Sequence, residues 1–155
     1  MIMDIGLMKK DRKVVSDALS RVLADSFSLY LKTLNYHWNV MGPHFSQLHK
    51  LFKELYEELE DAIDSIAERI RILGFHAPAN YSDYMRLTVI KEEKGHPEAF
   101  DMVRQLVLDN EYLIRRSHEV LSVAQSVADE ATMDLMIKRI KSHGKRAWML
   151  RSHLE

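Results

Sequence analysis

The sequence predicts an all-α fold, a bundle of four long helices with one crossover, and three observations lead to this prediction. The 155 residues include only five glycines and three prolines, so few residues interrupt regular structure. Apolar residues recur at steps of three and four through long segments, which is the period of an amphipathic helix. One connection of about twenty residues, 75–96, is too long for a simple hairpin and indicates a crossover along the bundle.

Composition limits the class of protein. A chain of this length is most simply one domain, which buries about two-thirds of its unfolded surface. The absence of cysteine excludes disulfides and thiolate metal sites, and a net charge of −1 gives no general basic bias toward nucleic acid. No apolar run approaches the roughly 20 residues of a membrane span. The first residues lack the charge order of a secretory signal, so we expect a cytoplasmic protein that does not contact a membrane.

The first helix is expected from Lys13 to Asn39, after a short N-terminal tail, so that the chain divides into a tail, 1–12, and one domain, 13–155. Its apolar stripe consists of Val15, Leu19, Val22, Leu23, Tyr30 and Leu34. The tail and the first helical residue carry four basic side chains among two acidic ones, at Lys9, Lys10, Arg12, Lys13, Asp4 and Asp11. We interpret this segment as a solvated helix start, with weak contacts to DNA phosphates as the alternative.

The second helix is expected to begin at Ser46 as N-cap and to stop at Gly74. One face carries a wide apolar stripe, formed by Leu48, Leu51, Phe52, Leu55, Tyr56, Leu59, Ala62, Ile63, Ile66, Ala67, Ile70 and Leu73. The other face carries acidic residues that we interpret as solvated, namely Glu54, Glu57, Glu58, Glu60 and Asp61. Arg69, near the end of this helix, is expected to pair with a carboxylate of a second subunit.

The remaining chain supplies a short helix and two more long ones. Residues 82–85 are expected to form a short extra helix within the long connection. The third long helix follows Pro97, a favourable residue for a first turn, and the last one follows Asp129 as N-cap. The core of this last helix is expected to contain Met133, Met136, Ile137, Ile140, Ala147, Trp148 and Leu150.

Four residues of the first two helices have side chains that ligate metal ions. His37 and His49 are followed by Asp64 and Glu68, which lie one helical turn apart. Fifteen residues of helix separate His49 from Asp64, a span of about 22 Å, whereas a metal reaches its ligands over about 2 Å. One ion cannot bind both ends within one chain. Two antiparallel copies solve this, so the predicted site lies between subunits, and a two-fold dimer contains two such sites.

A longer pattern around these residues resembles the Dps miniferritins (DNA-binding proteins from starved cells). The matching positions are His37-Trp38-Asn39-Val40, Gly42, Phe45, Leu48-His49, Tyr56, Asp64, Ala67-Glu68-Arg69 and the closing run Ala147 to Ser152. The resemblance covers nearly the whole chain. It implies a ferritin-like four-helix bundle that assembles through two-fold dimers into a hollow homo-dodecamer. It also implies oxidation of Fe(II) by hydrogen peroxide or O2, storage of the ferric mineral and protection of DNA from oxidative damage.

The resemblance makes His37, His49, Asp64 and Glu68 the catalytic and metal-binding residues of a ferroxidase-type oxidoreductase. Imidazole and carboxylate suit Fe(II) and Fe(III), and also Zn or Mn in the same site. One position departs from the family, because Lys53 replaces the usual carboxylate four residues after the second histidine. An ammonium group cannot ligate iron, so we expect weaker metal binding, with one ion per site instead of two.

Several roles stay open at the level of sequence. A DNA-compacting cage with impaired ferroxidase chemistry, nucleoid-associated in the cell, is the main alternative, and a helical interaction domain with incidental histidines is a second one. Trp38 is interpreted as core, or else as an electron donor beside the iron. Near the start of the last helix, acidic residues either cap the helix or line an iron-entry pore, at Asp129, Glu130 and Asp134. The only Glu-x-x-His, 93–96, lies in the long connection and not within a helix, which argues against a di-iron centre inside one subunit.

Overall fold

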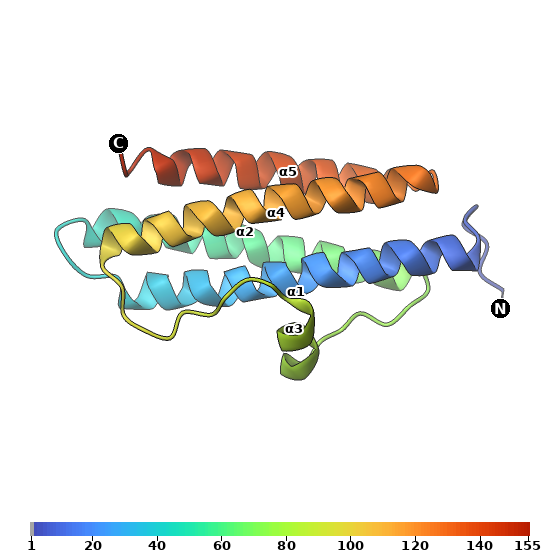
Figure 1. The fold of residues 1–155 in the computed structure, drawn as a ribbon, viewed down its shortest axis with the longest axis horizontal. Helices are drawn as coiled ribbons and strands as arrows, with labels where there is room; N and C mark the ends of the chain where they lie inside the picture. The colour runs from blue at the N-terminus through green and yellow to red at the C-terminus, as the bar shows by residue number, and fades with distance from the viewer. Residues whose placement is uncertain (1) are drawn as a thin grey trace.

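The computed structural model describes residues 2–155, and in this range it contains five helices and no strand (Figure 1). The helices are α1 (Lys9–Asn39), α2 (Phe45–Ile72), α3 (Tyr81–Leu87), α4 (Ala99–Ser126) and α5 (Glu130–Arg151). The predicted all-α fold is therefore confirmed. None of the helices in this range combines the length and the apolar character that a membrane crossing requires.

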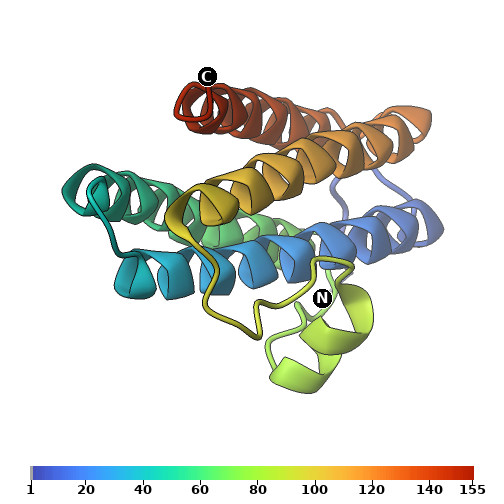
Figure 2. The ribbon, with the colours of Figure 1, turned by 60° about the vertical axis from the view of Figure 1, so that its left-hand side comes forward.

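The four long helices form a bundle of two antiparallel hairpins, α1 with α2 and α4 with α5 (Figures 1 and 2). Helix α1 also packs against α4, and α2 against α5. The connection after α2 returns along the length of the bundle to the start of α4, so α2 and α4 run in the same direction. The short helix α3 lies within this connection, outside the bundle and against α1. The crossover and its extra helix are confirmed.

Helix α1 begins earlier than predicted, at Lys9 instead of Lys13. Residues 9–12 of the predicted tail therefore belong to the helix, and Met1 lies outside the described residues. The contacts of Arg12 hold the start of α1 in place. Its buried guanidinium donates to the carbonyl of Leu73 at 2.8 Å and lies 3.0 Å from the sulfur of Met3. This arrangement fixes residues before the helix against the end of α2.

The predicted ends of α2 and α5 are correct in two of three cases. Gly74 stops α2 with a φ of +94°, a left-handed conformation that glycine adopts without strain. Asp129 caps α5, because its carboxylate accepts a hydrogen bond from the amide of Thr132 at 3.1 Å. The prediction of Ser46 as N-cap is wrong, since the helix already begins at Phe45 and His44 occupies the cap position without a side-chain hydrogen bond.

The bundle core contains two apolar clusters. The first lies toward the α1–α2 turn and includes Tyr36, Leu48, Phe52, Leu106 and Leu150. The second lies toward the opposite end and includes Leu19, Leu23, Ile66, Ile70 and Met136. Where the two clusters meet, buried polar side chains occur on three helices, namely Ser26, Asn110, Ser117, Arg139 and His143. We call these residues, together with Glu58, the polar layer.

Three predicted core residues are exposed. Ile137 of α5 is 40% exposed. Trp38 is 65% exposed and Trp148 is 62% exposed. In α5 the buried stripe steps through Met136, Arg139, His143, Ala147 and Leu150, so position 148 points away from the bundle. Trp38 follows the buried pair 36–37 at the end of α1 and faces outward for the same reason. The core interpretation of Ile137 and of both tryptophans is wrong for the single chain.

Candidate metal centre

The two predicted histidine ligands meet where α1 ends and α2 begins. The rings of His37 and His49 are stacked, with centroids 3.8 Å apart and planes inclined by 14°. Gly42 makes the turn between the helices possible, because its φ of +107° lies in a region that side chains other than glycine rarely adopt. The turn therefore brings together two imidazoles that are twelve residues apart.

Reciprocal hydrogen bonds fix the tautomer of both rings. The Nδ1 atom of His37 lies 2.6 Å from the carbonyl oxygen of His49, and the Nδ1 atom of His49 lies 2.7 Å from the carbonyl oxygen of His37. Since a carbonyl only accepts, each Nδ1 carries the hydrogen and donates it. Each Nε2 atom then presents a lone pair, and neither has a hydrogen-bond partner within residues 2–155. This is how metal-ligating imidazoles are commonly oriented.

Aromatic rings surround the imidazole pair. Phe45 stacks on His49 with centroids 5.0 Å apart, and Tyr56 meets His37 edge-on at 5.2 Å. His37 is buried and His49 is half-buried, so packing holds the pair at the edge of the bundle with one side open to solvent.

The two predicted carboxylate ligands lie elsewhere on the same chain. Asp64 and Glu68 are exposed on α2, at a distance along the helix that excludes a common ion with His49. Within residues 2–155 no group of three or more His, Cys, Asp or Glu gathers closely enough to hold a metal ion. One chain thus presents an imidazole half-site and, far from it, a carboxylate half-site.

Lys53 points along α2 and not back to the imidazole pair. Its side chain is 55% exposed, and its Nζ atom lies 3.8 Å from the carboxylate of Glu57, one turn further on. The residue therefore adds no ligand, and its charge is partly balanced by a neighbour on the same helix face.

Arg69 and Asp129 form an ion pair within one chain. Arg69 donates to Asp129 at 2.7 Å and to the hydroxyl of Thr132 at 3.0 Å, so it pairs with a carboxylate of its own chain, and its pairing with a second subunit stays a prediction. Asp129 is only 2% exposed and is fully used by this pair and by the cap of α5. A buried carboxylate cannot line a pore, which leaves Glu130 and Asp134, both exposed, as the candidates.

The centre of the polar layer was not predicted. Arg139 of α5 forms an ion pair with Glu58 of α2, which is therefore not part of the solvated acidic face. The second guanidinium nitrogen of Arg139 lies 3.1 Å from Nε2 of His143, whose Nδ1 donates to the side-chain oxygen of Asn110 at 2.8 Å. Asn110 in turn donates to the carbonyl of Leu106 at 2.7 Å. The i, i+4 spacing of the arginine and the histidine was the available signal.

Burial and charge set the protonation of this network. Burial, followed by the positive charge of Arg139, lowers the pKa of His143 to about 3, so this imidazole is neutral at pH 7. Burial alone would raise the pKa of Glu58, but hydrogen bonding and the charge of Arg139 outweigh it and lower that pKa. The layer therefore contains a carboxylate, a guanidinium and a neutral imidazole whose orientation is fixed.

A second unpredicted carboxylate holds the crossover in place. Asp25 of α1 is fully buried and accepts hydrogen bonds from the hydroxyl of Thr88 at 2.8 Å and from the amide of Val89 at 2.9 Å. Its other oxygen lies 3.3 Å from the hydroxyl of Tyr112 and 3.5 Å from Arg116. The segment after α3 is thus attached to two helices of the bundle.

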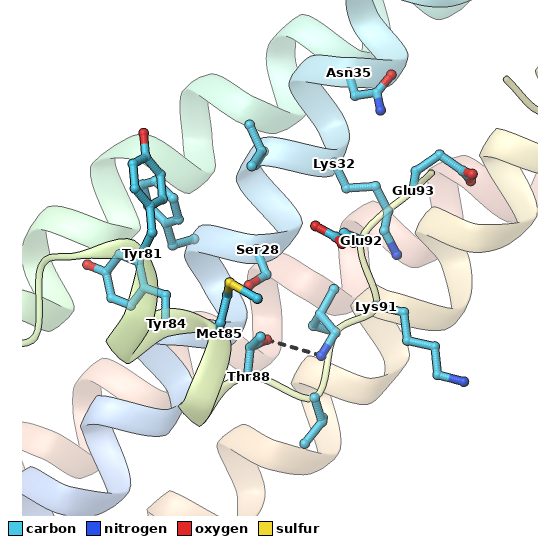
Figure 3. Close-up of a pocket in the computed structure, with 14 residues that line it drawn as sticks. Ser28, Lys32, Asn35, Tyr81, Tyr84, Met85, Thr88, Lys91, Glu92 and Glu93 are labelled. Atoms are coloured by element: carbon cyan, nitrogen blue, oxygen red, sulfur yellow. Dashed lines mark hydrogen bonds between the residues drawn. The ribbon is translucent and has the colours of Figure 1, made fainter. Parts of the chain in front are cut away.

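Beside this attachment, a groove of about 670 Å³ runs between α1 and the crossover (Figure 3). Its wall contains exposed apolar side chains from α1, α3 and the segment after α3, including Leu31, Tyr81, Met85 and Val89. Charged residues, among them Lys32, Glu92 and Glu93, border the other end (Figure 3).

The four-helix bundle with its crossover is the fold of a ferritin-like protein, and comparison with known proteins agrees. The family model described as the ferritin-like domain matches residues 16–155. The chain belongs to the Dps miniferritins within this family. It is 37% identical to the DNA protection during starvation protein 2 of Bacillus anthracis, over 92% of this chain and 97% of the relative.

A solved structure supports this assignment, and one further relative is similar over most of the chain. The crystal structure of a Dps protein from Vibrio cholerae O1, described as a member of a broad superfamily of ferritin-like diiron-carboxylate proteins, superposes with a TM-score of 0.95. That protein is 31% identical, and the match covers 100% of this chain and 98% of the other. The chain is also 42% identical to an uncharacterized low temperature-induced protein of Nostoc, over 98% of this chain and 86% of that protein.

Proposed function

We propose that this protein is a ferroxidase that oxidises Fe(II) with hydrogen peroxide or O2 at sites between subunits and stores the ferric product. The stacked imidazole pair carries this proposal. Hydrogen bonds from Nδ1 fix both rings in the tautomer that leaves the lone pair of Nε2 free to bind a metal ion. The stacking of the two rings does not require this lone pair. Ring nitrogens held in this way are a prepared half of a metal site.

The second half of the site comes from another subunit in this proposal. Asp64 and Glu68 are exposed one turn apart on α2 and have no ion-pair partner within residues 2–155. Two antiparallel copies of the α1–α2 hairpin bring these carboxylates to His37 and His49 of the partner. Fe(II), as substrate, then meets two neutral nitrogens and two anionic oxygens, a donor set that also accepts Zn and Mn.

The groove beside α1 supports a two-fold dimer. Its exposed apolar side chains lie on α1, on α3 and on the segment after α3. Helix α1 also carries His37, and α2, which carries the other proposed ligands, packs against it. Covering such a surface with a second copy removes apolar area from water. Six such dimers make the homo-dodecamer that the family resemblance implies, and the acidic face of α2 (except Glu58) is then available to nucleate mineral inside the cage.

The decisive experiment removes the imidazole half-site. We expect His37→Ala with His49→Ala to abolish peroxide-dependent oxidation of Fe(II), measured by stopped-flow absorbance, while Lys50→Ala, next to His49 on an exposed position, retains it. Light scattering establishes that each variant still assembles. Wild-type oxidation rates in the assembled double variant would refute the site.

Compaction of DNA is the second candidate function, because Lys9, Lys10 and Lys13 are exposed near the N-terminus and are multiplied in a cage. Two observations count against a strong effect. Lys13 already pairs with Asp17 at 2.5 Å, and Arg12 is buried against Leu73. A gel-shift titration across salt concentrations separates the two functions, since phosphate binding weakens steeply with salt.

A further inference from the structure

In the polar layer, two groups of the kind that ligate metal ions converge on the guanidinium of Arg139. Both carboxylate oxygens of Glu58, on α2, accept hydrogen bonds from Arg139 of α5. The Nε2 atom of His143 lies 3.1 Å from a terminal nitrogen of the same guanidinium. A carboxylate and an imidazole therefore enclose one positively charged group, and this group belongs to the chain itself.

The ring of His143 is oriented as it would be in a metal site. A guanidinium only donates hydrogen bonds, so Nε2 of His143 is the acceptor and its Nδ1 carries the hydrogen. That Nδ1 atom donates to the side-chain oxygen of Asn110 at 2.8 Å, and Asn110 is itself held by the carbonyl of Leu106. A carboxylate and a neutral imidazole with a fixed ring are ligands that divalent metal ions take in proteins.

Arg139 satisfies this pocket in charge more completely than in hydrogen bonding. Its terminal nitrogens make the contacts to Glu58 and His143, whereas its Nε atom is buried without a hydrogen-bond partner within residues 2–155. The side chain of Arg139 is 6% exposed, so its charge depends on Glu58 for compensation. A second cation brought to the same carboxylate and imidazole would be repelled at short range.

We propose that Arg139 acts as the permanent cation of a metal-type pocket and excludes divalent metal ions from the centre of the bundle. A guanidinium cannot lose its proton, so an ion can bind Glu58 and His143 only if this side chain leaves. Ferritin-like di-iron proteins build their centres from several carboxylates and histidines on facing helices, and this layer does not fit such a centre, because Glu58 is its only carboxylate.

The exclusion makes Arg139 a specificity-determining residue. It contacts no iron in this proposal, but it leaves the sites between subunits as the place where Fe(II) binds. This consequence rests on the proposed ferroxidase function, whereas the exclusion itself does not.

The test compares two substitutions that differ in charge. Arg139→Gln removes the cation and keeps an amide that can donate to Glu58, and Arg139→Lys keeps a cation. Both are combined with His37→Ala and His49→Ala, so that the imidazole half-site does not contribute. The probe is Co(II), because its visible absorption changes when it gains a nitrogen ligand. Assembled protein is dialysed to equilibrium against Co(II) without oxidant, and circular dichroism and light scattering check each variant.

We expect Arg139→Gln to bind about one Co(II) ion per chain, with an absorption band that a further His143→Gln substitution removes. Arg139→Lys and the protein with Arg139 unchanged should bind at least about tenfold more weakly and lack this band. Equal binding by Arg139→Gln and Arg139→Lys would overturn the proposal. So would a band in the protein with Arg139 unchanged that His143→Gln removes, or no additional Co(II) in an assembled Arg139→Gln variant.

A second variant keeps the test decisive if Arg139→Gln does not assemble. Arg139→His places another imidazole one turn before His143, and two histidines at this spacing with one carboxylate are a known set of metal ligands. We expect Co(II) to bind this variant and to raise its Tm, because an ion that binds only the folded state stabilises it. Lys138→His, at an exposed neighbouring position, is the matched control and should show no such rise. No rise in Arg139→His would overturn the proposal.

The two proposals fail separately in these experiments. The Co(II) measurements use neither an oxidant nor the histidines of the half-site. If the native protein does not oxidise Fe(II), the ferroxidase proposal is refuted and the result at Arg139 stands. If the native protein oxidises Fe(II) but neither Arg139→Gln nor Arg139→His gains Co(II), the role of Arg139 alone is refuted.

Discussion

The bundle contains two histidine arrangements that differ in what surrounds the ring. His37 and His49 stack at the open edge of the α1–α2 hairpin, donate from Nδ1 to main-chain carbonyls and leave Nε2 without a partner in residues 2–155. His143 lies in the polar layer, donates from Nδ1 to Asn110 and has its Nε2 beside the guanidinium of Arg139. In all three rings a fixed acceptor determines the tautomer, so the difference lies at Nε2.

This difference shows what makes an imidazole available to a metal. At the hairpin edge, Nε2 has no competing donor, and carboxylates from a second chain can approach. In the polar layer a cation already occupies the space in front of Nε2, and the nearest carboxylate, Glu58, is paired with that same cation. The positive charge in front of the His143 ring therefore comes from Arg139, a residue of the same chain.

The largest expected effect comes from removing that cation. Arg139→Met leaves Glu58 without its partner and Nε2 of His143 without a donor, and we expect it to lower the free energy of unfolding by about 3–5 kcal/mol. Chemical denaturation at fixed protein concentration measures the change. Lys138→Met, one residue away and exposed, is the matched control, with an effect within about 0.5 kcal/mol. A loss below about 1 kcal/mol for Arg139→Met would show that the polar layer is not a stabilising network.

Acid should reveal the same network through a gradual loss of stability, which is smaller at any one pH step than the effect of removing Arg139. The folded pKa of His143 is about 3, so the unfolded chain gains a proton below its ordinary pKa of about 6.5 while the folded chain does not. Stability should fall as the pH decreases from about 6.5 toward 3, by at most about 1.4 kcal/mol per pH unit for this residue. Glu58, whose pKa is lowered, adds a loss at the acid end.

Denaturation at several pH values in this range measures the slope. His143→Gln should have a shallower slope by close to one proton, and His118→Gln, at an exposed position, should retain the native slope. Identical slopes in the native protein and in His143→Gln would mean that other groups account for the acid sensitivity.

The smallest expected effect concerns Lys53, one turn after His49 of the stacked imidazole pair. Lys53→Asp restores a carboxylate four residues after His49, and we expect it to increase Fe(II) affinity by about tenfold, near 1.4 kcal/mol, and to raise the stoichiometry from one ion to two per site. Calorimetric titration without oxidant measures both quantities. Lys50→Asp makes the same charge change on another face of α2 and should leave both unchanged. Equal binding by Lys53→Asp and the native protein would contradict the role assigned to position 53.

Periodicity was sufficient to predict the helices and most of the core, because a helix buries one stripe whatever lies opposite. It failed at Trp148, where an apolar residue beside the stripe was counted as part of it. Local signals also succeeded at Gly74 and Asp129, whose roles depend on backbone conformation within a few residues. At Ser46 the same kind of signal failed, because the preceding turn already started the helix at Phe45.

The polar contacts were hard to predict, because their partners are distant in sequence. The sequence suggested that Arg69 pairs with a carboxylate of a second subunit. In the structure it pairs with Asp129, sixty residues away in the same chain. Asp25 is bound by residues of the crossover and of α4, and no local pattern marks it as buried. Of the candidate metal site, the sequence spacing predicted the separation of the two half-sites. The reciprocal carbonyl contacts of the histidines required the coordinates.

Those reciprocal hydrogen bonds also connect the end of α1 to the start of α2 across the turn between them. Each ring is anchored to the main chain of the opposite helix, so the last turn of α1 cannot fray without releasing the first turn of α2. Amide hydrogens on both sides of Gly42 should therefore exchange as one cooperative unit. In the proposed function both nitrogen ligands are therefore in position before an ion binds, and local opening of this turn would displace both of them together.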